Sequence, residues 1–178
     1  MFMKNNKKTK LVFRGVFARD TLPRKLPKIR PCAYICNIDE IRQPGRHWVC
    51  LYFPKKKPNE YYDSFGFPPH KDFLKLLGKA FKCNNHFHQY PLSTSCGQFC
   101  MFYILQRISS SSMEEVLKLF DKKELMVNEM LVKKTMKDEF NFVSPVFDSS
   151  YIRSQICKSF SQCGNFYTKA YIEQCVTF

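Results

Sequence analysis

The sequence predicts an α+β protein in which a few central strands are flanked by longer helices. Residues 47–53, HWVCLYF, form an apolar run rich in strand-forming residues. Residues 96–108, CGQFCMFYILQRI, are apolar on nearly every side, which is typical of a buried helix. The strand and helix patterns show little of the regular alternation that builds parallel βαβ sheets. A central strand and a buried helix are therefore expected to form the core.

The other elements follow from residue spacing and turn signals. Segment 11–30 carries Pro23 and Pro27 among basic residues, and we expect it to be irregular with one short helical turn. A capping box from Ser112 to Glu115 predicts the start of a helix. Further strands are expected at residues 31–38, 60–65 and 85–91. Further helices are expected at residues 71–81, 123–136 and 151–160.

Length and composition indicate one folded domain. The chain has 178 residues, of which 44% are hydrophobic and 16% aromatic, which favours a folded globule over a disordered tail. We expect residues 1–10 to be a flexible basic arm and residues 11–178 to be a single domain. No apolar run reaches the roughly 18 residues of a membrane span, and the N-terminus lacks the apolar core of a secretory signal. The nine cysteines are then expected to be mostly free thiols in a reducing compartment.

The net charge of +14 favours a polyanionic partner. Residues 1–30 hold most of the basic excess, which predicts nucleic-acid binding with a marked salt dependence. The alternative is a solvated basic tail that only aids solubility. The candidate nucleic-acid-binding residues are Lys4, Lys7, Lys8, Lys10, Arg14, Arg24, Lys25, Lys28 and Arg30.

The stretch QYPLSTSCGQFC, residues 89–100, places Cys96 where a helix begins. A thiolate is stabilised there by the helix dipole and by free N–H groups, which makes Cys96 a candidate nucleophile. The backbone N–H of Cys96 and the neutral side-chain amide of Gln89 could both stabilise an oxyanion. One such donor contributes on the order of 3 kcal/mol in the transition state.

His47 and Asp63 complete a candidate catalytic set. His47 opens the apolar strand, and Asp63 ends the next expected strand, so a hairpin would place them side by side. An imidazole beside the thiol and a third group that orients it are what a cysteine protease needs. Each residue alone has an ordinary explanation: a core cysteine, a surface histidine, a turn-capping aspartate. Their order and spacing favour catalysis.

The motifs together resemble the adenovirus-type endopeptidases, the adenain family. The shared pattern is His47-Trp48, then Asp63-Ser-Phe-Gly-Phe67, then Gln89-x-Pro-x-Ser-x-x-Cys96-Gly-x-Phe-Cys100. The resemblance covers residues 15–108. It implies a papain-like, ubiquitin-like-protease-type fold with a mostly antiparallel central sheet. It also implies His47 as base, Asp63 as its orienting group, Gln89 as oxyanion donor and Cys96 as nucleophile.

Two departures bear on the family assignment. Adenovirus enzymes usually carry Glu where Asp63 stands, whereas the SUMO-specific proteases of the same broad fold use Asp. Those proteases typically have five residues between the Gln and the Cys, and an Asp before the Cys. This chain has six residues there and Ser95, which favours the adenain side. Related proteases of Maverick/Polinton transposons and adenovirus-like agents are also compatible.

The resemblance implies partners as well as chemistry. The family acts on viral precursor proteins during virion maturation, needs no cofactor for the reaction, and is activated by DNA and by a capsid-derived peptide that joins through a disulfide. Cys83, just before Gln89, is the candidate for that disulfide, and a buried cysteine at the end of helix 71–81 is the alternative. A monomer in the virion and host nucleus is expected if the chain is viral, and otherwise an intracellular protein of nucleus or cytoplasm.

Three other functions were compatible with parts of the sequence. The first is a zinc site assembled from Cys83, His86, His88, Cys96 and Cys100, although a Cys-x₃-Cys pair inside an apolar helix is a poor zinc hairpin. The second is a basic nucleic-acid-binding module without catalysis. The third is a SUMO- or ubiquitin-like-specific protease, which shares the mechanism and differs in substrate.

Overall fold

The computed structural model describes residues 2–56 and 58–142. The chain divides into two units, Met1–Val143 and Ser144–Phe178, and the second lies outside the described residues. The helix expected at 151–160 lies there too. The extension of the domain to residue 178 therefore stays a prediction.

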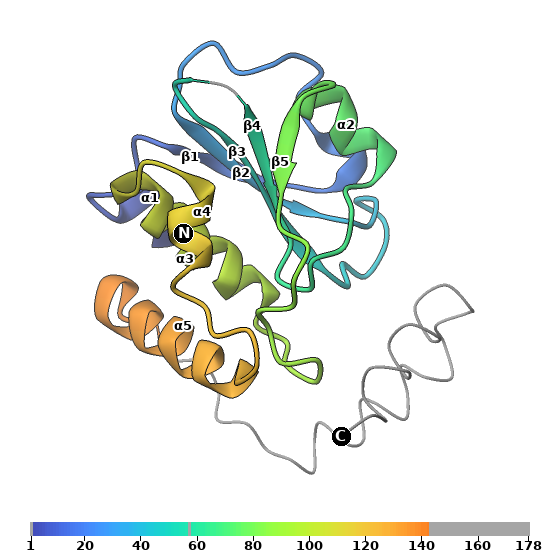
Figure 1. Cartoon of the computed structure of the whole chain (residues 1–178). Coiled ribbons are helices and arrows are strands. Elements are labelled where there is room, and N and C mark those ends of the chain that lie inside the picture. Colours follow the sequence, from blue (N-terminus) through green and yellow to red (C-terminus); the bar gives the residue numbers. More distant parts are fainter. Residues whose placement is uncertain (1, 57, 143–178) are drawn as a thin grey trace. The chain divides into compact units, whose positions relative to one another are not determined.

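A five-stranded sheet forms the centre of the described unit (Figure 1). Its strands lie side by side in chain order: β1 (Phe13–Phe17), β2 (Cys32–Asn37), β3 (Trp48–Phe53), β4 (Asn59–Tyr62) and β5 (Phe81–Cys83). The inner pairs β2/β3 and β3/β4 are antiparallel, whereas the outer pairs β1/β2 and β4/β5 are parallel. The sheet is thus mixed and not mostly antiparallel, because each edge strand is joined to its neighbour by a long crossover connection.

Helices cover both faces of this sheet. α3 (Cys96–Ser109), α4 (Met113–Leu117) and α5 (Leu125–Phe140) contribute to a core on one face. α2 (Lys71–Leu77) contributes to a core on the other face. Along β3, Cys50 and Tyr52 enter the first core, and Val49, Leu51 and Phe53 enter the second. This explains the continuous apolar run of β3, since a strand buried on both faces needs no polar side. The α+β class is confirmed.

The edge strands differ most from expectation. β1 lies in the segment expected to be irregular, next to a short 3-10 helix, η1 (Arg19–Thr21). Helix α2 ends at Leu77 and not at residue 81, because Gly78 adopts a φ of 80° and its N–H caps the Leu74 carbonyl. The chain thereby becomes free to form β5. Residues 85–91 form no strand, since the N–H groups of His88 and Gln89 both donate to the Ser64 carbonyl.

The first ten residues do not form the free arm that their charge suggested. Residues Phe2–Asn5 form a short helix, α1, whose Met3 side chain is buried in the same core as residues of α3 and α5. Thr9 is fully buried and donates its hydroxyl to the Met3 carbonyl at 2.6 Å. Lys8 pairs with Glu139 of α5. The apolar residues among the lysines are what hold this segment to the domain.

Candidate active site

His47 and Asp63 meet at one end of the sheet. His47 directly precedes β3 and Asp63 directly follows β4, and these strands are antiparallel with Cys50 opposite Tyr62. The Nε2 atom of His47 lies 2.8 Å from Oδ1 of Asp63. Both side chains are buried. The hairpin therefore brings together the two residues that sequence spacing had paired.

Several groups fix the Asp63 carboxylate and its backbone. Its Oδ1 atom also accepts the Phe65 N–H at 2.7 Å, and its Oδ2 atom accepts the Tyr61 hydroxyl at 3.4 Å. Buried Asn84 accepts the Asp63 N–H at 2.9 Å and donates to the Asp63 carbonyl at 2.5 Å. Sequence reasoning missed Asn84 and Tyr61, because no spacing marks an asparagine 21 residues away as a partner of Asp63.

Cys96 is the first residue of α3, as predicted, and its side chain is largely buried. One turn later, the Cys100 thiol donates to the Trp48 carbonyl at 3.4 Å. Because Trp48 follows His47, this contact ties the start of α3 to the start of β3. The nucleophile candidate and the base candidate are thereby held at the same place.

The environment of His47 favours its charged form. Burial of the ring acts to lower the pKa, but the hydrogen bond to Asp63, the polar interaction with Cys96 and the charges of both partners outweigh it and raise the pKa to about 9. Asp63 occupies Nε2, whereas Nδ1 is buried and lacks another polar partner among the described residues. Nδ1 is therefore the nitrogen available to the Cys96 thiol.

Gln89 is fully buried, and its amide is engaged within the protein. Its Oε1 atom accepts the Ser64 hydroxyl at 2.6 Å. Its Nε2 atom donates to the Ser93 carbonyl at 2.8 Å and to the Ser93 hydroxyl at 3.2 Å. Both amide hydrogens are used in this way, so donation to an oxyanion requires release of one of these bonds. The oxyanion role of Gln89 stays a prediction.

A buried polar network links this loop to α5. The Ser93 and Ser95 hydroxyls share a hydrogen bond, and Ser95 also donates to Glu129 at 2.5 Å. The second carboxylate oxygen of Glu129 accepts the Tyr90 N–H at 3.2 Å. Sequence reasoning also missed Glu129, because a single glutamate in an amphipathic helix ordinarily points to solvent.

An aromatic cluster lies on another side of His47. The Phe65 ring centroid is 5.0 Å from that of His47, and Phe65, Phe67 and Phe87 lie about 6 Å from one another, at 5.9 to 6.2 Å. Gly66 allows this arrangement, since its φ is +68° and an added Cβ would lie 2.8 Å from the His86 backbone. The Phe-Gly-Phe motif therefore fixes the surroundings of the histidine.

The remaining candidate residues lie outside this cluster. Cys83 is an exposed free cysteine on the edge strand β5, and not a buried cysteine at a helix end. Arg30 is partly buried and donates to Asn59 and to the Pro54 carbonyl. The other basic candidates are exposed.

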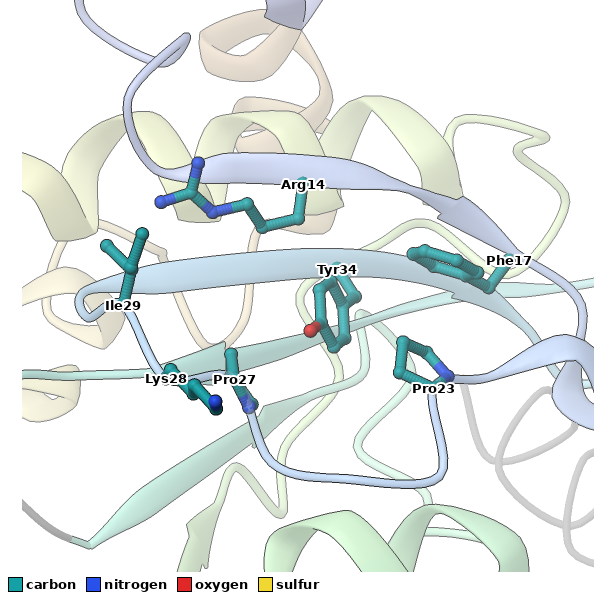
Figure 2. A pocket seen from close by; sticks show the side chains of 7 residues that line it. All are labelled: Arg14, Phe17, Pro23, Pro27, Lys28, Ile29 and Tyr34. Carbon is teal, nitrogen blue, oxygen red and sulfur yellow. The ribbon is translucent and has the colours of Figure 1, made fainter.

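Two of these basic residues border a pocket on the sheet face opposite α3. The pocket has a volume of about 370 Å³, and Figure 2 shows it between β1, β2 and the loop that joins them. Arg14 and Lys28 lie at its rim together with the rings of Phe17 and Tyr34. Its seven lining residues are Arg14, Phe17, Pro23, Pro27, Lys28, Ile29 and Tyr34. None belongs to the candidate catalytic set.

Two further features of the described residues bear on other functions. Within residues 2–56 and 58–142, no group of three or more His, Cys, Asp or Glu side chains is arranged to hold a metal ion. No helix in the same ranges is long and apolar enough to cross a membrane.

The fold, but not the sequence, is similar to a known protein. The sequence matches no family model and no curated protein. The fold is similar to that of the ASFV pS273R protease, with a TM-score of 0.44 and 20% sequence identity. The similarity covers 66% of this chain and 46% of that protein, so the chain spans less than half of its length.

Proposed function

We propose that this protein is a cysteine endopeptidase. The observation that carries the proposal is the arrangement of Cys96 at the start of α3 beside a buried His47 whose far nitrogen is held by Asp63 at 2.8 Å. The raised pKa of His47 supports a histidine that stays protonated near neutral pH. An imidazolium beside a thiol at a helix N-terminus is the arrangement that activates a cysteine nucleophile.

The reaction follows from these positions. The Cys96 sulfur bonds to the peptide carbonyl carbon, and the carbonyl electron pair moves to oxygen. When the tetrahedral intermediate collapses, the C–N bond breaks and the leaving amine takes the proton from His47. Water then gives a proton to His47 as its oxygen attacks the thioester, and Cys96 leaves as the thiolate. Asp63 holds the ring in position throughout.

The oxyanion is assigned to two donors beside the nucleophile. The N–H of Cys96 lies at the helix N-terminus. Gln89 is hydrogen-bonded to Ser93, and Ser93 is hydrogen-bonded to Ser95, the residue before Cys96. For Gln89 to serve, its longer bond, the 3.2 Å contact with the Ser93 hydroxyl, is the one we expect to open. Substrate binding would supply the replacement acceptor.

The test is hydrolysis of a fluorogenic Leu-x-Gly-Gly peptide by the purified protein. The adenain resemblance implies this substrate pattern, with glycine near the scissile bond and an apolar residue at P4. We expect turnover by the wild type and background rates for Cys96→Ala and His47→Ala. Asp63→Asn should retain more activity than either, because Asp63 acts only through the ring. Thermal unfolding of each variant checks that the fold is intact. A Cys96→Ala variant as active as the wild type would overturn the proposal.

The adenain-type specifics rest on the motif resemblance. They are processing of viral or virus-like precursor proteins, stimulation by DNA, and an activating peptide attached through Cys83. The exposure of Cys83 supports its access to a second thiol. In the same assay, duplex DNA should raise the rate at low salt and less so at moderate salt. A peptide with one cysteine should form a disulfide with the wild type and not with Cys83→Ser.

The pocket of Figure 2 supports a nucleic-acid contact in particular. Cationic side chains at an exposed rim suit phosphate groups, and Arg14 and Lys28 are two exposed basic residues that line this pocket. If DNA binds but leaves peptide hydrolysis unchanged, the basic surface serves targeting. Cleavage of a ubiquitin-like fusion in preference to the short peptide would instead favour the SUMO-protease alternative.

A further inference from the structure

Glu129 is a buried carboxylate that the reaction does not use. It lies on α5, and its side chain is almost entirely buried. Its Oε1 atom accepts the Tyr90 N–H at 3.2 Å and its Oε2 atom accepts the Ser95 hydroxyl at 2.5 Å. Within residues 2–56 and 58–142, no lysine or arginine forms an ion pair with it. The loop donors are therefore what compensates the burial of this charge.

These two donors lie at the two ends of the loop that precedes the nucleophile. Tyr90 follows Gln89 directly, and Ser95 precedes Cys96 directly. Glu129 thus holds the chain next to each of the two proposed oxyanion donors. The neighbouring Asn128 also attaches this loop to α5, since its Nδ2 atom donates to the His88 carbonyl at 3.0 Å.

The bond from Ser95 has a consequence for α3. Ser95 is the N-cap residue of α3, and a serine there ordinarily accepts a hydrogen bond from an N–H of the first turn. The Ser95 side chain makes no such cap bond: its hydroxyl points to Glu129 and Ser93 instead, and its backbone (φ −91°, ψ 12°) is not in the extended conformation of an ordinary N-cap. The first-turn N–H groups are left without this acceptor, so they stay available to an anion at Cys96.

We propose that Glu129 is a positioning residue that holds the Ser95 hydroxyl away from the N-terminus of α3. It thereby keeps the first-turn N–H groups open for the Cys96 thiolate and the oxyanion, and it fixes the loop between Gln89 and Cys96. Glu129 itself contacts neither substrate nor nucleophile. This inference rests on the proposed function.

The first test is the effect of Glu129→Ala on peptide hydrolysis. We expect kcat to fall roughly tenfold or more, because the donors move and the freed Ser95 hydroxyl turns to cap the helix. KM should stay within about twofold, since a positioning residue acts on the reaction step and not on substrate binding. The Tm should not fall, because the new cap and the loss of a buried charge offset the lost bonds. A Tm drop with an unchanged kcat per folded molecule would mean that Glu129 is only structural.

Two further variants sharpen this test. Glu129→Gln keeps an acceptor for the Tyr90 N–H and should retain an intermediate kcat, which also guards against poor folding of the alanine variant. Glu139→Gln removes another carboxylate of α5, one that pairs with Lys8 at the molecular surface, and it should leave the peptide kcat unchanged. Equal losses in Glu129→Gln and Glu139→Gln would overturn the proposal.

The double variant Ser95→Ala/Glu129→Ala tests the capping step by the direction in which kcat changes. Removal of the competing hydroxyl should restore part of the kcat that Glu129→Ala loses. A further loss on adding Ser95→Ala would contradict the proposal, because it would mean that Ser95 supports catalysis in another way.

A second measurement separates this inference from the protease assignment. The rate at which iodoacetamide labels Cys96 near neutral pH, located by mass spectrometry, needs no turnover. Labelling should be slower in Glu129→Ala than in the wild type and faster again in the double variant. If the three proteins label in this order but the wild type hydrolyses no peptide, the proposed function fails and the role of Glu129 stands. Equal labelling rates in all three proteins would refute that role.

Discussion

At the scale of single residues, two opposing effects determine the pKa of His47. Burial disfavours its proton, while Asp63 and Cys96 favour it, and the net effect is a pKa of about 9. A raised histidine pKa stabilises the fold fully below the unfolded value of roughly 6.5, and this contribution is lost as the pH rises from there through about 9. In the proposed reaction, the imidazolium that protonates the leaving amine is lost as the pH rises past about 9.

Removal of the thiol should therefore change the titration of His47. In Cys96→Ala the pKa should be lower than in the wild type, because one favourable partner is gone while burial and Asp63 remain. Two-dimensional NMR of the ring protons against pH measures it directly. Cys83→Ser is the matched control, since this exposed cysteine does not contribute to the pKa of His47. An unchanged pKa in Cys96→Ala would show that the two residues do not interact.

His88 is the opposite case. Its ring is buried and stacks on Phe120 with centroids 4.4 Å apart. Burial first, and then the charges of His86 and Lys122, lower its pKa to about 4. The unfolded chain takes up this proton at higher pH than the folded protein, so the free energy of unfolding should decrease as the pH falls from about 6.5 towards 4.

The variant His88→Phe tests that pH dependence. It keeps an aromatic ring on Phe120 but has no group to protonate. We expect the loss of unfolding free energy between pH 7 and pH 5 to be smaller than in the wild type, by on the order of 1–2 kcal/mol. Urea unfolding at both pH values measures this difference. Identical losses in the two proteins would exclude His88 as the source.

At the scale of elements, a buried ion pair joins the sheet to α3. Glu60 of β4 and Arg107 of α3 are both buried, and they are joined at 2.8 Å. Tyr103 also donates to Glu60 at 2.7 Å, and the Arg107 guanidinium lies 5.1 Å from the Tyr52 ring centroid. Because α3 carries Cys96 and the β3–β4 hairpin carries His47 and Asp63, this pair helps to hold the two halves of the site together.

Loss of one partner should be costly. Glu60→Ala leaves Arg107 buried without its carboxylate, and we expect the free energy of unfolding to fall by roughly 3–5 kcal/mol. Glu114→Gln is the contrasting variant, since its pair with Lys82 is solvent-exposed and should contribute less than about 1 kcal/mol. Denaturant unfolding compares the two, and a similar small effect for both would mean that the buried pair does not hold α3 in place.

How far the elements could be predicted depended on their burial. β3 and α3 were predicted because each is a long apolar segment, and the Cys96, His47 and Asp63 positions followed from them. The edge strands were not predicted, because β5 has only three residues and forms only once Gly78 ends α2. Asn84 and Glu129 could not be found from spacing, since their partners are distant in sequence and specified only by the packing of β5 and α5.

At the scale of the whole molecule, the charge of +14 is distributed over separate surfaces. Lys8 of the N-terminal segment pairs with α5, whereas Arg14 and Lys28 border the pocket on the opposite sheet face. A basic excess arranged in this way predicts that some charges contribute more to DNA binding than others.

Duplex DNA binding at several salt concentrations tests this distribution. Arg14→Ala/Lys28→Ala should weaken binding and reduce the slope of log Kd against log salt by about 2, one for each lost phosphate contact. Lys118→Ala/Lys122→Ala removes the same charge near α4 and should have a smaller effect. Equal effects of the two double variants would mean that the charge acts diffusely and that the pocket is not a DNA site.

The most direct test of the central claim is covalent trapping of the nucleophile by a Leu-x-Gly-Gly peptide that ends in a vinyl sulfone. Mass spectrometry then locates the adduct among the nine cysteines. We predict one peptide per protein, attached to Cys96, and a much slower reaction in His47→Ala. An adduct on another cysteine such as Cys83, or equal rates in wild type and His47→Ala, would contradict the assignment of Cys96 and His47 as the catalytic pair.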